Sequence, residues 1–73
     1  MEGTHVAQDA ETGKALAVRR FEAGITQIAV AKELGINRST LSLIENGWRA
    51  IPEGFQTEYL HALQRLAPQR VAS

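Results

Sequence analysis

The chain contains no cysteine and few aromatic residues among its 73 positions. Without cysteine it can form neither disulfides nor cysteine-ligated zinc sites. The two histidines, His5 and His61, are too few and too far apart in the sequence to suggest another metal site. Chains below about 80 residues usually need additional stabilisation, and these absences leave only well-packed helices and a partner subunit to supply it.

Long apolar runs are also absent. Residues 1–9 contain none, so a secretory signal peptide is not expected. No stretch approaches the roughly 18 to 20 apolar residues of a membrane span. The sequence therefore predicts a cytoplasmic protein of one domain with no membrane partner. It has no paired acids, Cys/His site or phosphate-binding loop, which argues against an enzyme, a cofactor or a small-molecule substrate.

Net charge is zero, with eight basic and eight acidic residues. DNA-binding domains are usually basic, so this balance argues against nucleic acid as the partner. The distribution is uneven, however, because residues 14–49 hold six of the basic residues and only three acidic ones. Charges act over roughly a Debye length, about 10 Å, so this local surplus of positive charge favours an anionic partner on that part of the chain.

Glycines and capping residues divide the chain into helical segments. Residues 1–11 are polar without periodicity and predict a flexible N-terminal arm. Thr12 is a candidate N-cap for a first helix over residues 13–23, which Gly24 ends. The apolar face expected in this helix consists of Leu16, Ala17 and Phe21, with Val18 beside it.

Two short helices follow. Thr26 is the candidate cap of a helix over residues 27–34, which Gly35 ends. Asn37 is the candidate cap of the next, over residues 38–46, which Gly47 ends. The residues expected to point inward are Ile28, Val30, Ala31, Leu34, Ile36, Leu41 and Ile44.

A fourth helix is expected to run from Pro52 to about Leu66, because proline suits the first helical position. Gly54 is a poor helix residue, so a start nearer Phe55 is the alternative. Its apolar stripe consists of Phe55, Tyr59, Leu60, Leu63 and Leu66. The prediction is thus an all-α fold of four helices, or five as the alternative, with an arm (1–11), a domain (12–67) and a C-terminal tail (68–73).

Residues 27–46 meet the requirements of a helix-turn-helix. Ala31 is small enough for the place where the two helices approach, and Gly35 accepts the positive φ of the turn. Ile36 can be buried beneath that turn. The second helix of the pair has an inner anchor in Leu41 and Ile44, and its first turn is polar and exposed.

Residues 13–66 resemble the phage lambda repressor-like (Xre-type) helix-turn-helix family. The resemblance rests on Gly24-Ile25-Thr26-Gln27, Ala31, Leu34-Gly35-Ile36, Ser39-Thr40-Leu41-Ser42 and Ile44-Glu45-Asn46-Gly47. It implies a DNA-binding regulator that binds as a homodimer. The chain is less basic than many members of that family, and the fifth helix that closes some family dimers is not expected after the fourth.

The resemblance also implies roles for individual residues. Gln27 is expected to contact a phosphate and brace the recognition helix, and Asn46 to contact a phosphate beyond that helix. Base edges are expected to be read by Arg38, Ser39 and Ser42. Arg38 is unfavourable with the dipole of its own helix, which favours an external partner.

Other polar residues nearby have mainly structural interpretations. Thr26 is first a cap and Thr40 first sets the helix start, with DNA contact as the second role of each. Arg49 is one of several cations, together with Arg19, Arg20 and Lys32, of which one or two are expected to lie against phosphates. Glu45 is expected to pair with Arg19 or Arg20, because an unpaired carboxylate there would repel DNA. The predicted DNA-binding residues are Thr26, Gln27, Arg38, Ser39, Thr40, Ser42, Asn46 and Arg49.

These features predict a sequence-specific transcriptional regulator, a small dimeric repressor of a phage or mobile-element promoter. Its recognition helix is expected to enter the major groove of double-stranded DNA at a palindromic operator. The fourth helix, with Trp48 beside it, is the predicted dimer surface, since its stripe has more apolar area than one core needs. The alternative is a protein-interaction module with the same fold, such as a dimerising antitoxin.

Overall fold

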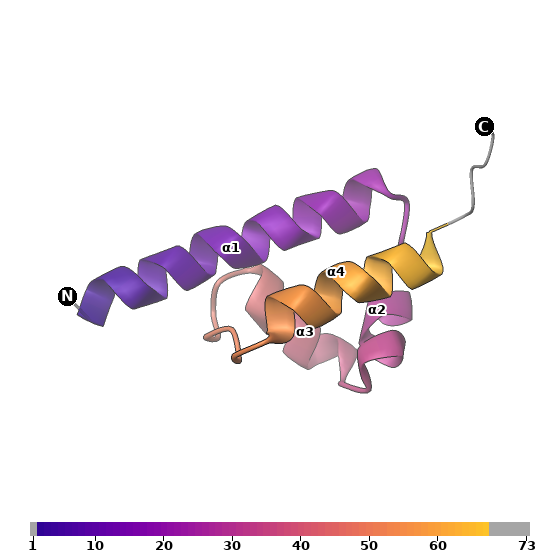
Figure 1. The fold of residues 1–73 in the computed structure, drawn as a ribbon. Helices are drawn as coiled ribbons and strands as arrows, with labels where there is room; N and C mark the ends of the chain where they lie inside the picture. The colour runs from indigo at the N-terminus through magenta and orange to yellow at the C-terminus, as the bar shows by residue number, and fades with distance from the viewer. Residues whose placement is uncertain (1, 68–73) are drawn as a thin grey trace.

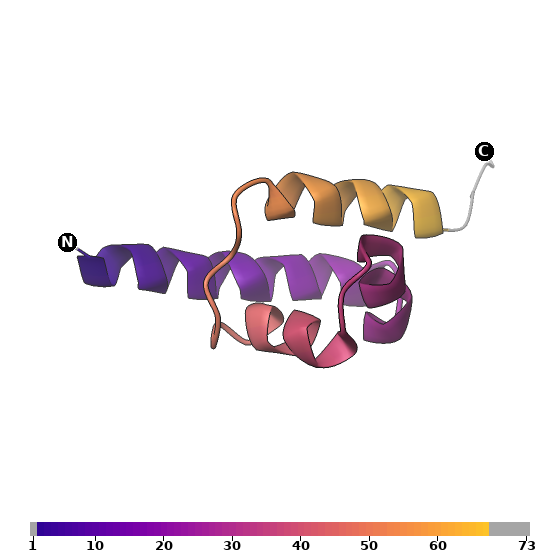
Figure 2. The same cartoon turned by 90° about the horizontal axis from the view of Figure 1, so that it is seen from below.

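The computed structural model describes the backbone of residues 2–67 and the side chains of residues 10–67. Contacts join α1 to α3 and α4, and α2 to α3 and α4, and α1 and α4 run alongside each other in two perpendicular views (Figures 1 and 2). Within the described residues no strand occurs, which confirms the predicted all-α, four-helix fold. The helices are α1 (Glu2–Glu22), α2 (Gln27–Leu34), α3 (Arg38–Glu45) and α4 (Phe55–Leu66).

The turn between α2 and α3 has the predicted chemistry. Thr26 is the N-cap of α2, and its Oγ1 accepts a hydrogen bond from the Ala29 N–H at 3.1 Å. Gly35 follows α2 with a φ of 72°, a left-handed conformation that disfavours any side chain. Asn37 is the N-cap of α3 by position, but its side chain makes no capping hydrogen bond. Helix α2 therefore has its predicted bounds, whereas α3 ends at Glu45, one residue before the predicted Asn46.

The core lies where the four helices meet. Leu41, Val30 and Tyr59 are its largest fully buried side chains. Ile36 is half-buried against this core beneath the α2–α3 turn. Burial of Leu41 and Ile44 confirms the inner anchor predicted for α3. The buried cluster consists of Leu16, Ile25, Val30, Ala31, Leu41, Tyr59 and Leu63.

Helix α1 is longer than predicted. It begins at Glu2, so the predicted start at Thr12 is wrong and the predicted arm is helical backbone from Glu2 onward. Extending a helix adds one hydrogen bond for each residue that it orders, which favours growth from an existing turn. Gly13 lies inside α1 because the helix passes close to α3: a Cβ there would lie 2.2 Å from the carbonyl oxygen of Ile44. The predicted tail, 68–73, lies outside the described residues, and the division into arm, domain and tail stays a prediction.

Two apolar residues predicted to point inward are exposed. Phe21 is 78% exposed and Ile28 is 60% exposed. The inner stripe of α1 instead runs through Gly13, Leu16 and Arg20, at helical spacings that leave Phe21 to one side. In α2 the stripe begins at Gln27 and not at Ile28. A polar side chain thus occupies an inward position in each helix.

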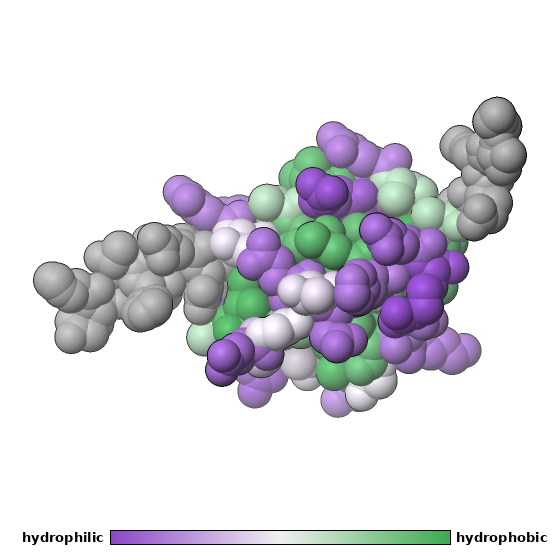
Figure 3. Space-filling model, in the orientation of Figure 1, coloured by the Kyte–Doolittle hydropathy of each residue, from purple (hydrophilic) through white to green (hydrophobic). Residues whose placement is uncertain are grey.

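Helix α4 begins at Phe55, the alternative start, and Pro52 precedes it. Its stripe is mostly used by the core: Tyr59 and Leu63 are buried, while Leu60 and Leu66 are half-buried against the core. Less apolar area of α4 is thus left exposed than was predicted, and Trp48 beside it is 79% exposed. The dimer surface on α4 stays a prediction. In Figure 3, hydrophobic residues form separate patches between hydrophilic ones on the face shown. Among the described helices, none has the length and apolarity to cross a membrane.

Candidate nucleic-acid interface

Helix α3 directs one polar face outward and packs its opposite face against the rest of the domain. Leu41, Ile44 and Glu45 are its buried residues, so the opposite face is directed outward. Arg38 and Ser39 are exposed, whereas Thr40 and Ser42 are half-buried. A shallow hollow of about 360 Å³ lies along this face, lined by Arg38, Ser39, Ser42 and Leu43. The structure thus brings the predicted base-reading residues to one accessible surface.

The two ends of this surface are formed by residues predicted to contact phosphates. At one end, Thr26 and Gln27 lie at the start of α2. At the other end, Asn46 follows α3, and its Nδ2 donates to the Ser42 carbonyl oxygen at 2.8 Å and to Ser42 Oγ at 3.3 Å. Asn46 therefore closes the last turn of α3. Arg49 is exposed in the segment that follows.

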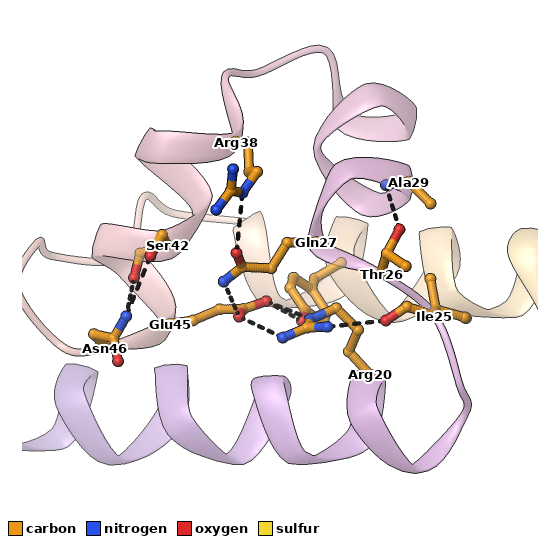
Figure 4. A network of polar contacts seen from close by, with 10 residues as sticks. Arg20, Ile25, Thr26, Gln27, Ala29, Arg38, Ser42, Glu45 and Asn46 are labelled. Atoms are coloured by element: carbon orange, nitrogen blue, oxygen red, sulfur yellow. Dashed lines mark hydrogen bonds and ion pairs between the residues drawn. The ribbon is translucent and has the colours of Figure 1, made fainter.

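Beneath this surface, four helices contribute to one polar network around the carboxylate of Glu45 (Figure 4). Arg20 binds this carboxylate with both arms of its guanidinium, Nε to Oε2 at 2.9 Å and Nη2 to Oε1 at 3.0 Å. Tyr59 donates its hydroxyl to Oε2 at 2.6 Å, and Gln27 donates Nε2 to Oε1 at 2.9 Å. Arg20 Nη1 also donates to the carbonyl oxygen of Ile25 at 2.9 Å. We call Arg20, Gln27, Glu45 and Tyr59 the polar network.

The polar network is buried, and each of its side chains is hydrogen-bonded to another member. The side chain of Glu45 is only 3% exposed and that of Arg20 is 14% exposed. Among the residues that the structure describes, no buried side-chain polar atom lacks a hydrogen bond. A buried charge is costly unless it is paired and hydrogen-bonded, and here both conditions are met.

The protonation states follow from this packing. Burial alone raises the pKa of the Glu45 carboxyl, but the hydrogen bonds from Arg20, Gln27 and Tyr59 outweigh it and leave the pKa below its ordinary value. The hydrogen bond to Glu45 raises the pKa of Arg20. Burial, and then the hydrogen bond to Glu45, raises the pKa of Tyr59. At neutral pH the network therefore holds a carboxylate, a guanidinium and a protonated phenol.

The network confirms the predicted pairing of Glu45 and decides between the two candidates, since Arg20 and not Arg19 binds it. Glu45 is neutralised beneath the surface, so it does not act against an anionic ligand as an exposed carboxylate would. The exposed charge along residues 14–49 consequently keeps its positive surplus. Lys14, Arg19, Lys32, Arg38 and Arg49 are all exposed.

Gln27 was expected to brace the recognition helix, and its hydrogen bonds join it to Glu45 and Arg38 of α3. Sequence reasoning missed its inward position in α2, and it missed Tyr59 as a polar partner of Glu45. Both leave a signal in the sequence, because each completes an apolar stripe at helical spacing. Gln27 lies four and seven residues before Ala31 and Leu34, and Tyr59 lies four residues before Leu63. A tyrosine on a core stripe also brings a hydroxyl that needs a partner when buried. A single polar residue on such a stripe therefore indicates a network within the core.

Within the described part of the chain, no three His, Cys, Asp or Glu side chains gather in a way that could hold a metal ion. Comparison with known proteins gave one finding. A family model described as helix-turn-helix matches residues 16–54, which is more than half of the 73 residues. No curated protein and no solved structure matches the chain significantly. The match spans α2, the turn, α3 and the part of α1 that contains Arg20.

Proposed function

Because this chain belongs to the phage lambda repressor-like helix-turn-helix family and is a DNA-binding regulator, we propose that it is a sequence-specific, homodimeric transcriptional repressor. The family is regulatory and not enzymatic. We further propose that the dimer acts in the cytoplasm at a palindromic operator in a phage or mobile-element promoter. Repression by occlusion is the simplest mechanism that a DNA-binding domain can supply by itself.

The observation that carries the proposal is the contrast between the two faces of α3. Its inner face is anchored by Leu41, Ile44 and the paired Glu45, while its outer face presents Arg38 and Ser39. A helix held in this way can lie in the major groove with the side chains of its first turns toward base edges. Arginine suits this role because its guanidinium binds the O6 and N7 atoms of guanine together.

The remaining residues receive roles from their places around α3. Base contacts are proposed for Arg38, Ser39 and Ser42, with Thr40 as a secondary contact. Phosphate contacts are proposed for Gln27 and Thr26 at the start of α2, and for Asn46 and Arg49 beyond the end of α3. The hydrogen bonds of Asn46 to Ser42 keep its side chain at the helix end. Because a phosphate only accepts hydrogen bonds, its contact with Asn46 requires Nδ2 to exchange one of these partners.

A second candidate function, a protein-interaction module such as a dimerising antitoxin, is supported by one observation. Phe21 and Ile28 are both exposed and line a hollow of about 520 Å³ next to Gln27 and Arg38. An exposed apolar patch of this kind is typical of a protein contact. Its position beside the proposed DNA surface allows one protein to do both.

The deciding experiment selects binding sites from a random duplex library with the purified protein and then titrates the enriched site against salt. A repressor of the proposed kind enriches a palindrome and shows a salt slope of several units. Arg38→Ala is expected to relax the preference at the base that Arg38 contacts, because one bidentate base contact accounts for about 1–3 kcal/mol of discrimination. Arg65→Ala is the matched control, since Arg65 is an arginine of α4 paired with Glu33.

No enriched sequence, even at low salt, contradicts the proposal and favours the protein-interaction module. Co-purification from cells of a specific protein partner whose binding is lost in Phe21→Ser would then support that second function. Sedimentation of the free protein and of its operator complex tests the proposed dimer separately.

A further inference from the structure

The side-chain amide of Gln27 lies between two partners of opposite chemistry. Its Nε2 donates to Glu45 Oε1 at 2.9 Å, and its Oε1 accepts from Arg38 Nε at 3.4 Å (Figure 4). Glu45 is buried, whereas Arg38 is exposed on the proposed DNA surface. Gln27 therefore connects the interior of the domain to the residue that is proposed to read a base.

The orientation of this amide follows from its partners. A carboxylate can only accept hydrogen bonds, so the Gln27 amide must turn its NH₂ toward Glu45. The carbonyl oxygen of the amide is then directed away from Glu45. A guanidinium can only donate, so this oxygen is the group that Arg38 requires. If the amide turned over, it would place donors against Arg38 and an acceptor against a carboxylate.

Glu45 is itself held in place by residues far along the chain. Arg20 from α1 binds both of its oxygens, and Tyr59 from α4 donates to Oε2 at 2.6 Å. Tyr59 is fully buried at the centre of the core. The position of the Glu45 carboxylate is consequently determined by core packing.

We propose that Glu45 is a positioning residue for base reading: together with Tyr59 it orients the amide of Gln27, which in turn orients the guanidinium of Arg38. This proposal rests on the proposed function, because it assumes that Arg38 contacts a base. The contact between Arg38 and Gln27 is long for a hydrogen bond. Such a bond directs the guanidinium before DNA arrives and is easily exchanged when a base edge replaces it.

The proposal predicts that variants within the network lower discrimination between bases more than they lower affinity for random DNA. In Gln27→Met, which keeps the length of the side chain but no hydrogen-bonding groups, discrimination at the base contacted by Arg38 is expected to fall about tenfold, within the range for one bidentate contact. In Tyr59→Phe, which acts through two further hydrogen bonds, it is expected to fall about threefold. Glu45→Gln is the most direct change, but it leaves Arg20 without a full counter-charge and endangers folding.

The experiment measures, for each variant, binding to the selected operator, to operators with each substitution at that base, and to random duplex. Leu60→Ala is the matched control, because Leu60 lies beside Tyr59 on α4 and packs against the core without joining the network. A parallel measurement without DNA follows the Nε–H signal of Arg38 by NMR. In Gln27→Met and Tyr59→Phe this signal is expected to shift, and in Leu60→Ala it is expected to stay.

The outcomes distinguish failure of the positioning proposal from failure of the proposed function. If the wild-type protein enriches no sequence, the proposed function fails, and base positioning fails with it. If the wild type discriminates at the base that Arg38 contacts and Arg38→Ala does not, the function stands. The positioning proposal is then overturned if Gln27→Met and Tyr59→Phe keep full discrimination or leave the Arg38 signal unshifted. A loss that is equal at every base, or equal in Leu60→Ala, also overturns it.

Discussion

Among the residues that the structure describes, two arginine–glutamate pairs connect separate helices, and they differ in burial. Arg20 and Glu45 join α1 to α3 with side chains 14% and 3% exposed, at 2.9 Å. Arg65 and Glu33 join α4 to α2 with side chains 51% and 30% exposed, at 2.5 Å. The distance in the second pair is the shorter. Water nevertheless competes for its charges, because both side chains are partly exposed.

The difference teaches that the number of partners and the exclusion of water, and not the separation of the charges, decide what an ion pair contributes. Glu45 accepts hydrogen bonds from three residues, so its loss leaves several buried donors without an acceptor. Loss of Glu33 is expected to lower the free energy of unfolding little, because water can hydrogen-bond to Arg65 in its place. Four variants or conditions test this comparison.

Glu45→Ala is expected to have the largest effect. Breaking a buried ion pair from one side costs about 3–5 kcal/mol, because it leaves an uncompensated charge. Small domains have about 5–15 kcal/mol of stability in total, so most of the stability of this chain is at risk. Urea denaturation followed by circular dichroism measures the change. A loss no larger than that of Glu33→Ala contradicts the comparison.

Acid is expected to have the next effect, since it removes the charge of Glu45 but keeps the side chain. The pKa of Glu45 is lower in the folded protein than its ordinary value of 4.5. As pH falls below about 4.5, the unfolded chain takes up the proton first, so the free energy of unfolding decreases. This stabilisation is fully present above that pH. Urea midpoints from pH 7 to pH 3 measure it, and the decrease is expected to be smaller in Glu45→Gln but unchanged in Glu33→Gln.

Tyr59→Phe removes one donor of the network and leaves the ring in the core. Hydrogen bonds to charged groups contribute about 1.5–3 kcal/mol, and the lower end is expected because Arg20 and Gln27 still bind Glu45. Thermal and urea unfolding measure this loss. An unchanged midpoint would mean that the hydroxyl contributes nothing beyond the packing of the ring.

Arg65→Ala is expected to have the smallest effect, because exposed ion pairs contribute about 0–1 kcal/mol. A double-mutant cycle with Glu33→Ala isolates the pair from other effects of each substitution. Repeating the cycle at high salt sharpens the comparison, since screening is expected to reduce this coupling further. The same cycle for Arg20 and Glu45 is expected to give a larger coupling that salt changes little.

Much of the fold could be predicted from local sequence, and the errors have a common cause. The α2–turn–α3 unit was predicted because Thr26, Gly35 and the Leu41–Ile44 spacing act within a few residues of one another. The inward positions of Phe21 and Ile28 were predicted wrongly because apolar residues were assigned to the core by type. The inward positions are held by Arg20 and Gln27, because both bind Glu45, which lies in another helix. The base- and phosphate-contacting roles of the candidate surface stay predictions until DNA binding is measured.

The sequence by itself determined where α2 begins and ends, where α3 begins, which small residue lies at their turn, and that α3 has one apolar and one polar face. These features depend on backbone conformation and hydrogen bonds between near neighbours, which a short stretch of residues specifies. Only the tertiary structure decided that Arg20 and not Arg19 binds Glu45, and that Tyr59 reaches the same carboxylate. Adjacent residues of a helix point about 100° apart, so the choice between them depends on how distant helices pack.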